Sequence, residues 1–173
     1  MKKLILIVVA SLLFLTGCNT SASVIDSEKM DEVVNAIKEA YGDDYGPEVE
    51  IEAEMIKDVY QIDTENLEYF IVEGPMMSLS TDMMFALLAK DGKVDEVVAD
   101  VEAYQDYLIN ESFQYPMNMA RVKASQIVVK GNAVFFLVLG AFDERTEVSE
   151  EEALEFAQEQ VSIGVDAIES LLG

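Results

Sequence analysis

The chain has 173 residues, of which 34 are acidic and 11 basic, and its formal charge at neutral pH is −23. A field of this sign repels nucleic acid and anionic lipid head groups, so we exclude nucleic-acid binding and expect cationic or neutral partners, or partners that bring divalent ions. Because 51% of the residues are hydrophobic, the charge does not indicate disorder, and we expect a folded domain with an acidic surface.

The N-terminal segment has the order of a secretory signal. Lys2 and Lys3 precede an apolar run over residues 4–15. This run is 12 residues long, whereas a helix needs roughly 20 apolar residues to cross a bilayer. We therefore predict that residues 1–17 are a cleaved signal peptide rather than a transmembrane anchor. Without this segment and its two lysines, the formal charge becomes −25.

The predicted signal ends in Leu15, Thr16, Gly17 and Cys18. This tetrad resembles the lipobox of bacterial lipoproteins, in which the cysteine receives a diacylglycerol before cleavage. Cys18 is the only cysteine in the chain, and a lone free thiol would be a liability in an oxidising compartment. We expect residues 18–27 to be a lipidated cysteine and a polar tether, which would hold the protein at the extracytoplasmic face of the cell membrane.

The remaining residues, 28–173, fit one domain better than two. The first predicted element is an amphipathic helix over residues 28–41, where apolar residues recur every three or four positions. Asp26 or Ser27 is placed to cap its start, and Gly42 follows as a stop signal. Residues 43–54 hold six carboxylates around a Gly-Pro break, so we expect a turn or loop there, with a short helix over residues 53–60 as an option.

Two strands are expected next. Residues 67–73 are rich in aromatic and β-branched side chains and are followed by Gly74 and Pro75, which is typical of a strand. Residues 83–90 are ambiguous, because Ser80 could cap a helix there. The run is short and mostly apolar and is closed by an Asp-Gly pair, so we favour a buried strand.

A second long helix is predicted over residues 93–112, where an apolar stripe lies opposite acidic positions. We expect the pair Tyr115-Pro116 to end it, since a residue before proline avoids the helical conformation. Residues 126–130 and 133–139 are β-rich runs joined by Gly131-Asn132. A two-residue Gly-Asn link predicts a hairpin with a type II′ turn.

The last predicted element is a helix over residues 149–172, which begins with a capping box of Ser149 and Glu152. The order helix, two strands, helix, hairpin, helix predicts an α+β fold with a mainly antiparallel sheet of about four strands packed with three helices.

Several of these features together resemble one family. A lipobox, an N-terminal helix, paired strands, a helix ending near Tyr115-Pro116 and a strand pair around Lys130-Gly131-Asn132 are similar to the bacterial lipoproteins catalogued as domain of unknown function 4358. The resemblance covers about residues 31–140 and leaves the helix at 149–172 as an extension. It implies a fold and an extracytoplasmic location, and because the family has no established activity it transfers no catalytic residue.

The residue types limit the possible chemistry. The chain has no histidine, which excludes Ser-His-Asp and Cys-His nucleophile systems. If Cys18 carries lipid, a thiol enzyme and a Cys/His zinc site are also excluded. No glycine-rich nucleotide motif is present, and we expect no cofactor. A carboxylate pair, as in glycoside hydrolases, remains the one catalytic option, but there is no tryptophan to stack on a sugar. We therefore expect no enzymatic activity.

A calcium site is the other option that carboxylates allow. Its candidate ligands are Asp43, Asp44, Glu48 and Glu50. Their spacing lacks the D-x-D-x-D-G pattern of a calcium loop, so a solvated acidic face is the favoured interpretation and we predict no metal site.

A set of methionines lies near the expected sheet edge: Met76, Met77, Met83, Met84, Met117 and Met119. Methionine fills cores but also lines adaptable binding surfaces or ligates soft metals. We favour the core, and exposure of several of them together would favour a peptide or lipid groove.

The leading hypothesis is therefore a monomeric, membrane-anchored, non-enzymatic binding or accessory module that acts on a protein or envelope partner. The alternatives are a small-ligand or cation-binding lipoprotein and a carboxylate-dependent hydrolase. A flat acidic face would favour the first, a closed apolar pocket the second, and paired buried carboxylates the third.

Overall fold

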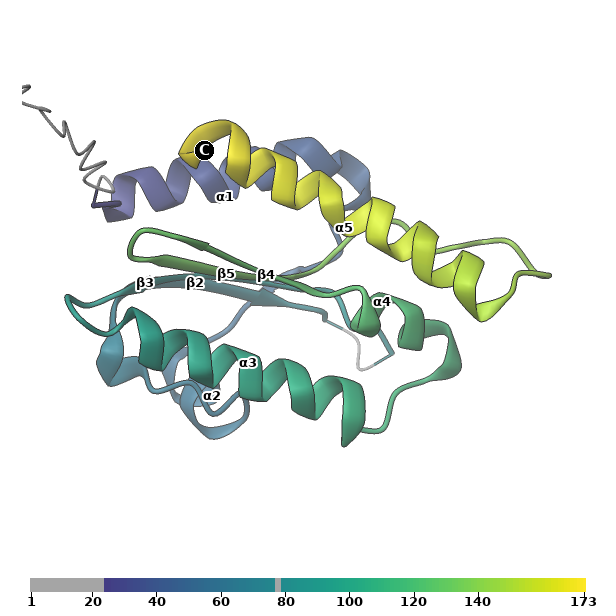
Figure 1. The fold of residues 1–173 in the computed structure, drawn as a ribbon, viewed down its shortest axis with the longest axis horizontal. Coiled ribbons are helices and arrows are strands. Elements are labelled where there is room, and N and C mark those ends of the chain that lie inside the picture. The colour runs from purple at the N-terminus through teal and green to yellow at the C-terminus, as the bar shows by residue number, and fades with distance from the viewer. Residues whose placement is uncertain (1–23, 77–78) are drawn as a thin grey trace, which may run out of the picture.

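Five antiparallel strands form the middle layer of the protein, in the order β1-β2-β3-β5-β4 (Figure 1). The computed structural model describes residues 24–76 and 79–173, so the predicted signal, Cys18 and Met77 lie outside the described residues. The strands are β1 (Val49–Glu50), β2 (Leu67–Gly74), β3 (Met83–Ala89), β4 (Gln126–Lys130) and β5 (Ala133–Val138).

Helices cover both faces of this sheet. They are α1 (Ser27–Tyr41), α2 (Ala53–Asp58), α3 (Val94–Asn110), α4 (Met119–Lys123) and α5 (Glu150–Leu172). Figure 1 shows α1 and α5 on one face and α2 and α3 on the other, while α4 lies at one end of the sheet. None of the helices in the described ranges combines the length and apolar composition that a bilayer crossing requires.

The central strand β3 explains why two cores exist. All seven of its side chains are buried. Alternate residues point to opposite faces of a strand, so Met84 and Leu88 pack beneath α1 and α5 while Phe85 and Leu87 pack against α2 and α3. A strand covered on both faces needs no polar alternation. The uninterrupted apolar run is therefore a strand and not a capped helix, as predicted.

The predicted hairpin is confirmed. Lys130 pairs with Ala133, and Gly131 has a φ of +56° while Asn132 has a negative φ. A positive angle at the first central residue alone is the type II′ geometry. Asn132 also fixes the start of the domain, because its side chain accepts a hydrogen bond from Ile25 N (2.8 Å) and donates one to Ile25 O (2.9 Å).

The first and last predicted helices are confirmed with their caps. Asp26 accepts a hydrogen bond from Lys29 N at the start of α1. At the start of α5, the Ser149 hydroxyl accepts from Glu152 N, and the Glu152 carboxylate accepts from Ser149 N. Both sequence signals therefore mark helix starts because they satisfy amides that have no partner within the helix.

The second long helix is confirmed as α3, but Tyr115-Pro116 does not end it. The helix ends at Asn110, where Ser112 N donates to Tyr107 O and the Ser112 hydroxyl donates to Leu108 O. Pro116 instead begins a 3-10 turn, Pro116–Asn118.

The α+β class is confirmed, but the sheet has five strands instead of about four, and two short helices join the three long ones. Part of the expected loop at 43–54 forms β1, whose two residues are both exposed and give no alternation signal. Helix α2 lies at the optional site of a short helix. Helix α4 has five residues, which is too few to produce a recognisable 3.6-residue period.

Candidate functional site

The two ends of the sheet differ in character. At one end lie the turn Gly131-Asn132 and the first described residues of the chain, and we call this the hairpin end (Figure 1). At the opposite end, the connections that leave β2, α3 and β5 come together. We call this the loop end, and it comprises residues 75–76, 79–82, 111–118 and 140–148.

A buried ion pair joins two segments of the loop end to helix α4. The Arg121 guanidinium donates to both carboxylate oxygens of Asp82, with Nη1 3.2 Å from Oδ2, and also to Gly140 O at 2.6 Å. The Ser80 hydroxyl donates to Asp82 Oδ2 at 2.5 Å. The ring of Phe142 stacks on the guanidinium, 4.1 Å from its central carbon. This pairing fixes the start of β3, helix α4 and the chain after β5 relative to one another.

Two further buried polar groups accompany the pair. Asn118 Nδ2 donates to Leu79 O at 2.8 Å, but Asn118 Oδ1 and Thr81 Oγ1 find no hydrogen-bond partner in the part of the chain that the structure describes. Buried polar atoms without a partner are uncommon in native proteins. The interior of the loop end is thus polar, unlike the two apolar cores.

Exposed apolar side chains are frequent at the loop end, next to charged ones such as Glu144 and Glu147. Phe113 is 86% exposed, Met76 70% and Met117 69%, and Phe113 makes an edge contact with Tyr115 at 5.7 Å between ring centroids. Together, six of the thirteen large hydrophobic side chains exposed on the described residues belong to this end, namely Met76, Leu79, Phe113, Tyr115, Met117 and Phe142. Grouped exposed apolar side chains mark interaction surfaces more often than scattered ones do.

The methionine prediction is only partly right. Met83 and Met84 are buried in the two cores and Met119 is half-buried. Met76 and Met117 are exposed because they lie in connections beyond the ends of β2 and α3, where no helix covers them.

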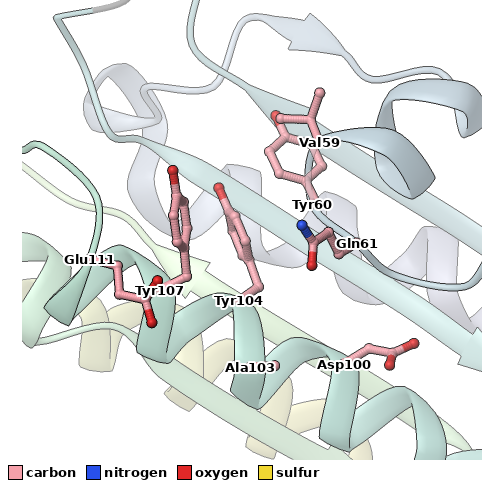
Figure 2. A pocket seen from close by; sticks show the side chains of 8 residues that line it. All are labelled: Val59, Tyr60, Gln61, Asp100, Ala103, Tyr104, Tyr107 and Glu111. Atoms are coloured by element: carbon pink, nitrogen blue, oxygen red, sulfur yellow. The ribbon is translucent and has the colours of Figure 1, made fainter.

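A second feature is a cavity of about 510 Å³ on the α2 and α3 side of the sheet (Figure 2). One wall is Val59, Tyr60 and Gln61, which follow α2. The other wall is a single stripe of α3, made of Asp100, Ala103, Tyr104 and Tyr107, together with Glu111 directly after the helix. We call this cavity the tyrosine groove.

Three rings form the middle of the tyrosine groove. Tyr60 meets Tyr104 edge to face at 5.1 Å, and Tyr107 lies nearly parallel to Tyr104 at 6.4 Å. Figure 2 shows the rings of Tyr104 and Tyr107 side by side with their hydroxyls pointing the same way. Phe85 of the core stacks behind Tyr104 at 5.7 Å. The core therefore holds the ring of Tyr104, which is 8% exposed, whereas Tyr107 is 49% exposed.

The backbone of the groove wall is strained at Gln61. Its φ of +58° is the only positive value at a non-glycine position in the described residues. Such a conformation costs on the order of 1–3 kcal/mol and tends to occur at functional sites. Neighbouring contacts hold it: Ile62 N donates to Ile56 O, and Asp63 N donates to Asp100 Oδ2 at 3.0 Å.

The charge of the groove is negative. Neither Asp100 nor Glu111 forms a salt bridge with a described residue, and no lysine or arginine lines the cavity. Burial raises the pKa of the Tyr60 and Tyr104 phenols above the usual value of 10.0, so both hydroxyls stay protonated at neutral pH. The groove therefore presents neutral rings between two carboxylates.

The candidate metal ligands are not brought together. Asp43 and Asp44 lie in the 3-10 turn after α1, Glu50 lies in β1, and Glu48 precedes it. Within residues 24–76 and 79–173, no three acidic side chains converge as a metal site would require. The lipobox residues Leu15, Thr16 and Gly17 and the candidate lipid site Cys18 lie outside the described residues.

In the described part of the chain, no two buried carboxylates face each other as the catalytic pair of a glycoside hydrolase does. Asp82 faces Arg121, and the largely buried Glu73 side chain accepts from Lys38 Nζ at 2.5 Å and from the Tyr45 hydroxyl at 2.7 Å. Each carboxylate is thus held by a cation or a phenol rather than by a second carboxylate.

Sequence reasoning did not find the tyrosine groove or the ion pair. The apolar stripe predicted over residues 93–112 could take either Tyr104 or Gln105, and the three-residue spacing between Tyr104 and Tyr107 was the available signal for the groove. The facing wall depends on the positive φ of Gln61. Glycine or asparagine is the usual sequence signal for such an angle, and neither occupies this position. Asp82 and Arg121 are 39 positions apart, a separation for which periodicity carries no information.

One comparison with known proteins identifies a family. A family model described as "Domain of unknown function (DUF4358)" matches residues 40–139. No curated protein and no solved structure matches the chain. The matched stretch includes the whole sheet with α2, α3 and α4, whereas nearly all of α1 and the whole of α5 lie outside it. In this protein, the segments on either side of the matched stretch therefore supply the helical layer over one face of the sheet.

Proposed function

We propose that this chain, which belongs to the DUF4358 family, is an exported lipoprotein that acts as a non-enzymatic binding module at the outer face of the cell membrane. Diacylglycerol on Cys18 would anchor it, and its partner would be a protein or another component of the envelope. The observation that carries the proposal is the group of exposed apolar side chains at the loop end, opposite the point where the chain enters the domain.

The arrangement of the two ends supports an outward orientation. Seven positions separate Cys18 from Ile25, and the tether that we propose there would reach about 15 Å as a flexible chain. Ile25 is bound to Asn132 at the hairpin end, so that end would stay near the bilayer. The 17-residue helix α3 runs from the hairpin end to the loop end, a rise of about 25 Å. The loop end would therefore face away from the membrane.

The composition of the loop end favours a partner other than lipid. Aromatic side chains and methionine are enriched at protein interfaces, and here they include Phe113, Tyr115 and Met117. An apolar surface turned away from its own bilayer gains nothing from membrane contact. The strong negative charge of the chain would in addition select cationic or neutral partners.

A second candidate function is small-ligand or cation binding. The tyrosine groove supports it, because its volume of about 510 Å³ lies in the range of small-molecule sites and its two carboxylates lack a cationic neighbour.

The binding proposal can be tested by cross-linking on intact cells. Cys18 is the only cysteine, so once it is lipidated an introduced cysteine is the only reactive thiol. We would place a thiol-coupled photocross-linker at Phe113→Cys on the loop end and, as a matched control, at Val129→Cys, which is exposed on β4. We expect one defined adduct from position 113 that is absent from position 129.

The adduct should depend on the surrounding apolar surface. Adding Tyr115→Asp and Met117→Asp to Phe113→Cys should abolish it without changing the amount of protein at the membrane. Equal adduct patterns from positions 113 and 129, or an adduct that survives both aspartates, would overturn the assignment of the loop end as the binding surface.

A further inference from the structure

We propose that the tyrosine groove binds a linear alkyl polyamine, with ammonium groups at Asp100 and Glu111 and the methylene chain lying along the tyrosine rings (Figure 2). This deepens the second candidate function and does not depend on the loop end.

The groove has the length of an extended chain. Asp100 lies in α3, and Glu111 directly follows the last residue of that helix, eleven positions further along the chain. At the rise of a helix this separation is about 16 Å along the axis, on nearly the same face. Tyr104 and Tyr107 lie between them on this face. Two anionic ends separated by an apolar, aromatic middle match a molecule with two cationic ends and a hydrocarbon centre.

The electrostatics select a cation. The groove carries two carboxylates and no basic side chain, so an anion would meet repulsion with nothing to offset it. A divalent metal ion would need several oxygen ligands at one point, whereas these carboxylates stand at opposite ends of the stripe. Alkylammonium groups need one acceptor each, and the acidic character of the whole protein raises their local concentration.

The aromatic rings add attraction beyond that of the negative charge of the protein. A cation near the face of a tyrosine gains about 0.5–2 kcal/mol, depending on how far it is desolvated. Methylene groups gain from contact with the same rings. Tyr104 is more than nine-tenths buried and lines the cavity, yet its hydroxyl bonds to no described residue. That hydroxyl is free to accept a hydrogen bond from an amine.

The structure also fixes the groove before any ligand arrives. Phe85 supports Tyr60 and Tyr104 from the core, and the hydrogen bond from Asp63 N orients Asp100. The hydrogen bond from Ile62 N to Ile56 O holds the second wall at the strained Gln61. A preformed site loses less entropy on binding than one that must be ordered.

The test is a titration of the full chain in nonionic detergent at neutral pH with doubly protonated diamines of increasing length, from 1,3-diaminopropane to 1,8-diaminooctane, and with spermidine. The chain has no tryptophan and seven tyrosines, three of which line the groove, so tyrosine fluorescence reports binding directly. Calorimetry provides an independent readout. We expect saturable binding that strengthens with length, and N-acetyl-lysine amide, with one ammonium, to bind at least about fivefold more weakly than the long diamines.

Variants locate the site. Asp100→Asn can still accept the bond from Asp63 N, and Glu111→Gln and Tyr107→Ala change exposed or half-exposed groups, so all three should fold. Each should weaken binding of the long diamines about fivefold or more. The matched control is Glu102→Gln, an exposed acid on the same helix outside the groove, which should leave the affinity unchanged.

Three outcomes would overturn the proposal: affinity independent of diamine length, displacement of spermidine by equimolar magnesium, or an equal loss in Glu102→Gln and Asp100→Asn. Any of these would reduce the effect to nonspecific attraction by a polyanion. The loop-end double variant Tyr115→Asp, Met117→Asp should bind diamines normally, so failure of this proposal and failure of the cross-linking experiment can be told apart.

Discussion

Arg121 and Asp82 form a buried ion pair, with the guanidinium donating to both carboxylate oxygens and to the carbonyl of Gly140. Removing one partner of such a pair leaves the other charge buried without compensation. The pair connects two segments of the loop end with α4, so its loss should loosen the surface that we assign to partner binding.

We therefore predict that Arg121→Gln lowers the free energy of unfolding by about 3 kcal/mol. Denaturant unfolding measures this, and the double variant with Asp82→Asn should lose less than the sum of the two single changes. The control is Glu96→Gln in the exposed pair with Lys93, which should have no measurable effect. A loss in Arg121→Gln as small as that of the control would show that the pair does not hold the loop end together.

Gly164 allows α5 to lie close to both α1 and the sheet. A Cβ atom at this position would be 2.9 Å from Leu137 Cδ1 and 2.9 Å from the Tyr41 hydroxyl, and Gly164 N donates to that hydroxyl at 3.0 Å. In an isolated helix, alanine would be favoured by about 1 kcal/mol. We predict the opposite sign here: Gly164→Ala should lower the melting temperature, while Ser162→Ala on the exposed side of α5 should not. A stabilised Gly164→Ala would contradict this packing.

Buried tyrosines should make the protein sensitive to alkali. Burial raises the pKa of Tyr41 from 10.0 to about 12. It also raises the pKa of Tyr45 and of Tyr104. The folded state holds these protons more tightly than the unfolded state, so the stabilisation is complete below pH 10 and is lost as the pH rises toward 12.

Urea unfolding between pH 8 and pH 12 measures this effect, and tyrosinate absorbance should develop at higher pH in the folded than in the unfolded protein. Tyr41→Phe should flatten the decline above pH 10, although it removes the hydrogen bond to Gln160 O. A decline of unchanged steepness in that variant would show that Tyr41 does not contribute.

Millimolar calcium should raise the melting temperature only slightly and without saturation, as screening of a formal charge of −25 would. The reason is that Asp43, Asp44, Glu48 and Glu50 are not gathered at one point among the described residues. Magnesium at the same concentration should have the same effect. A saturable shift at micromolar calcium that magnesium does not reproduce would establish a site that we have not assigned.

The sequence predicts the elements of this fold whose local pattern favours the same conformation as their tertiary contacts do. The apolar run of β3, the Gly131-Asn132 turn and the Ser149 capping box are local signals that the tertiary structure reinforces. The two exposed residues of β1 belong to the sheet only because the edge of β2 is available to them, and no local pattern contains that information.

The candidate sites were less accessible to prediction for the same reason. The tyrosine groove exists because Tyr60, which lies outside any helix or strand next to the strained residue Gln61, contacts Tyr104 of α3. The exposed side chains of the loop end, such as Phe113, show no periodicity that would distinguish them from core residues. Contacts between distant segments create both features, so residue types alone could indicate the acidic character of the protein but not the position of either site.

The central claim, an outward-facing module anchored by lipid, depends most directly on Cys18. Two acyl chains would give stable anchoring, since each buried methylene contributes about 0.8 kcal/mol and one chain gives only marginal binding. The decisive measurement is the mass of the N-terminal peptide of the protein extracted from membranes with detergent. We predict a chain that begins at Cys18 and carries diacylglycerol, together with a Cys18→Ala variant that is uncleaved or released. An unmodified Cys18, or a variant that is cleaved at the same site and stays membrane-bound, would contradict the account.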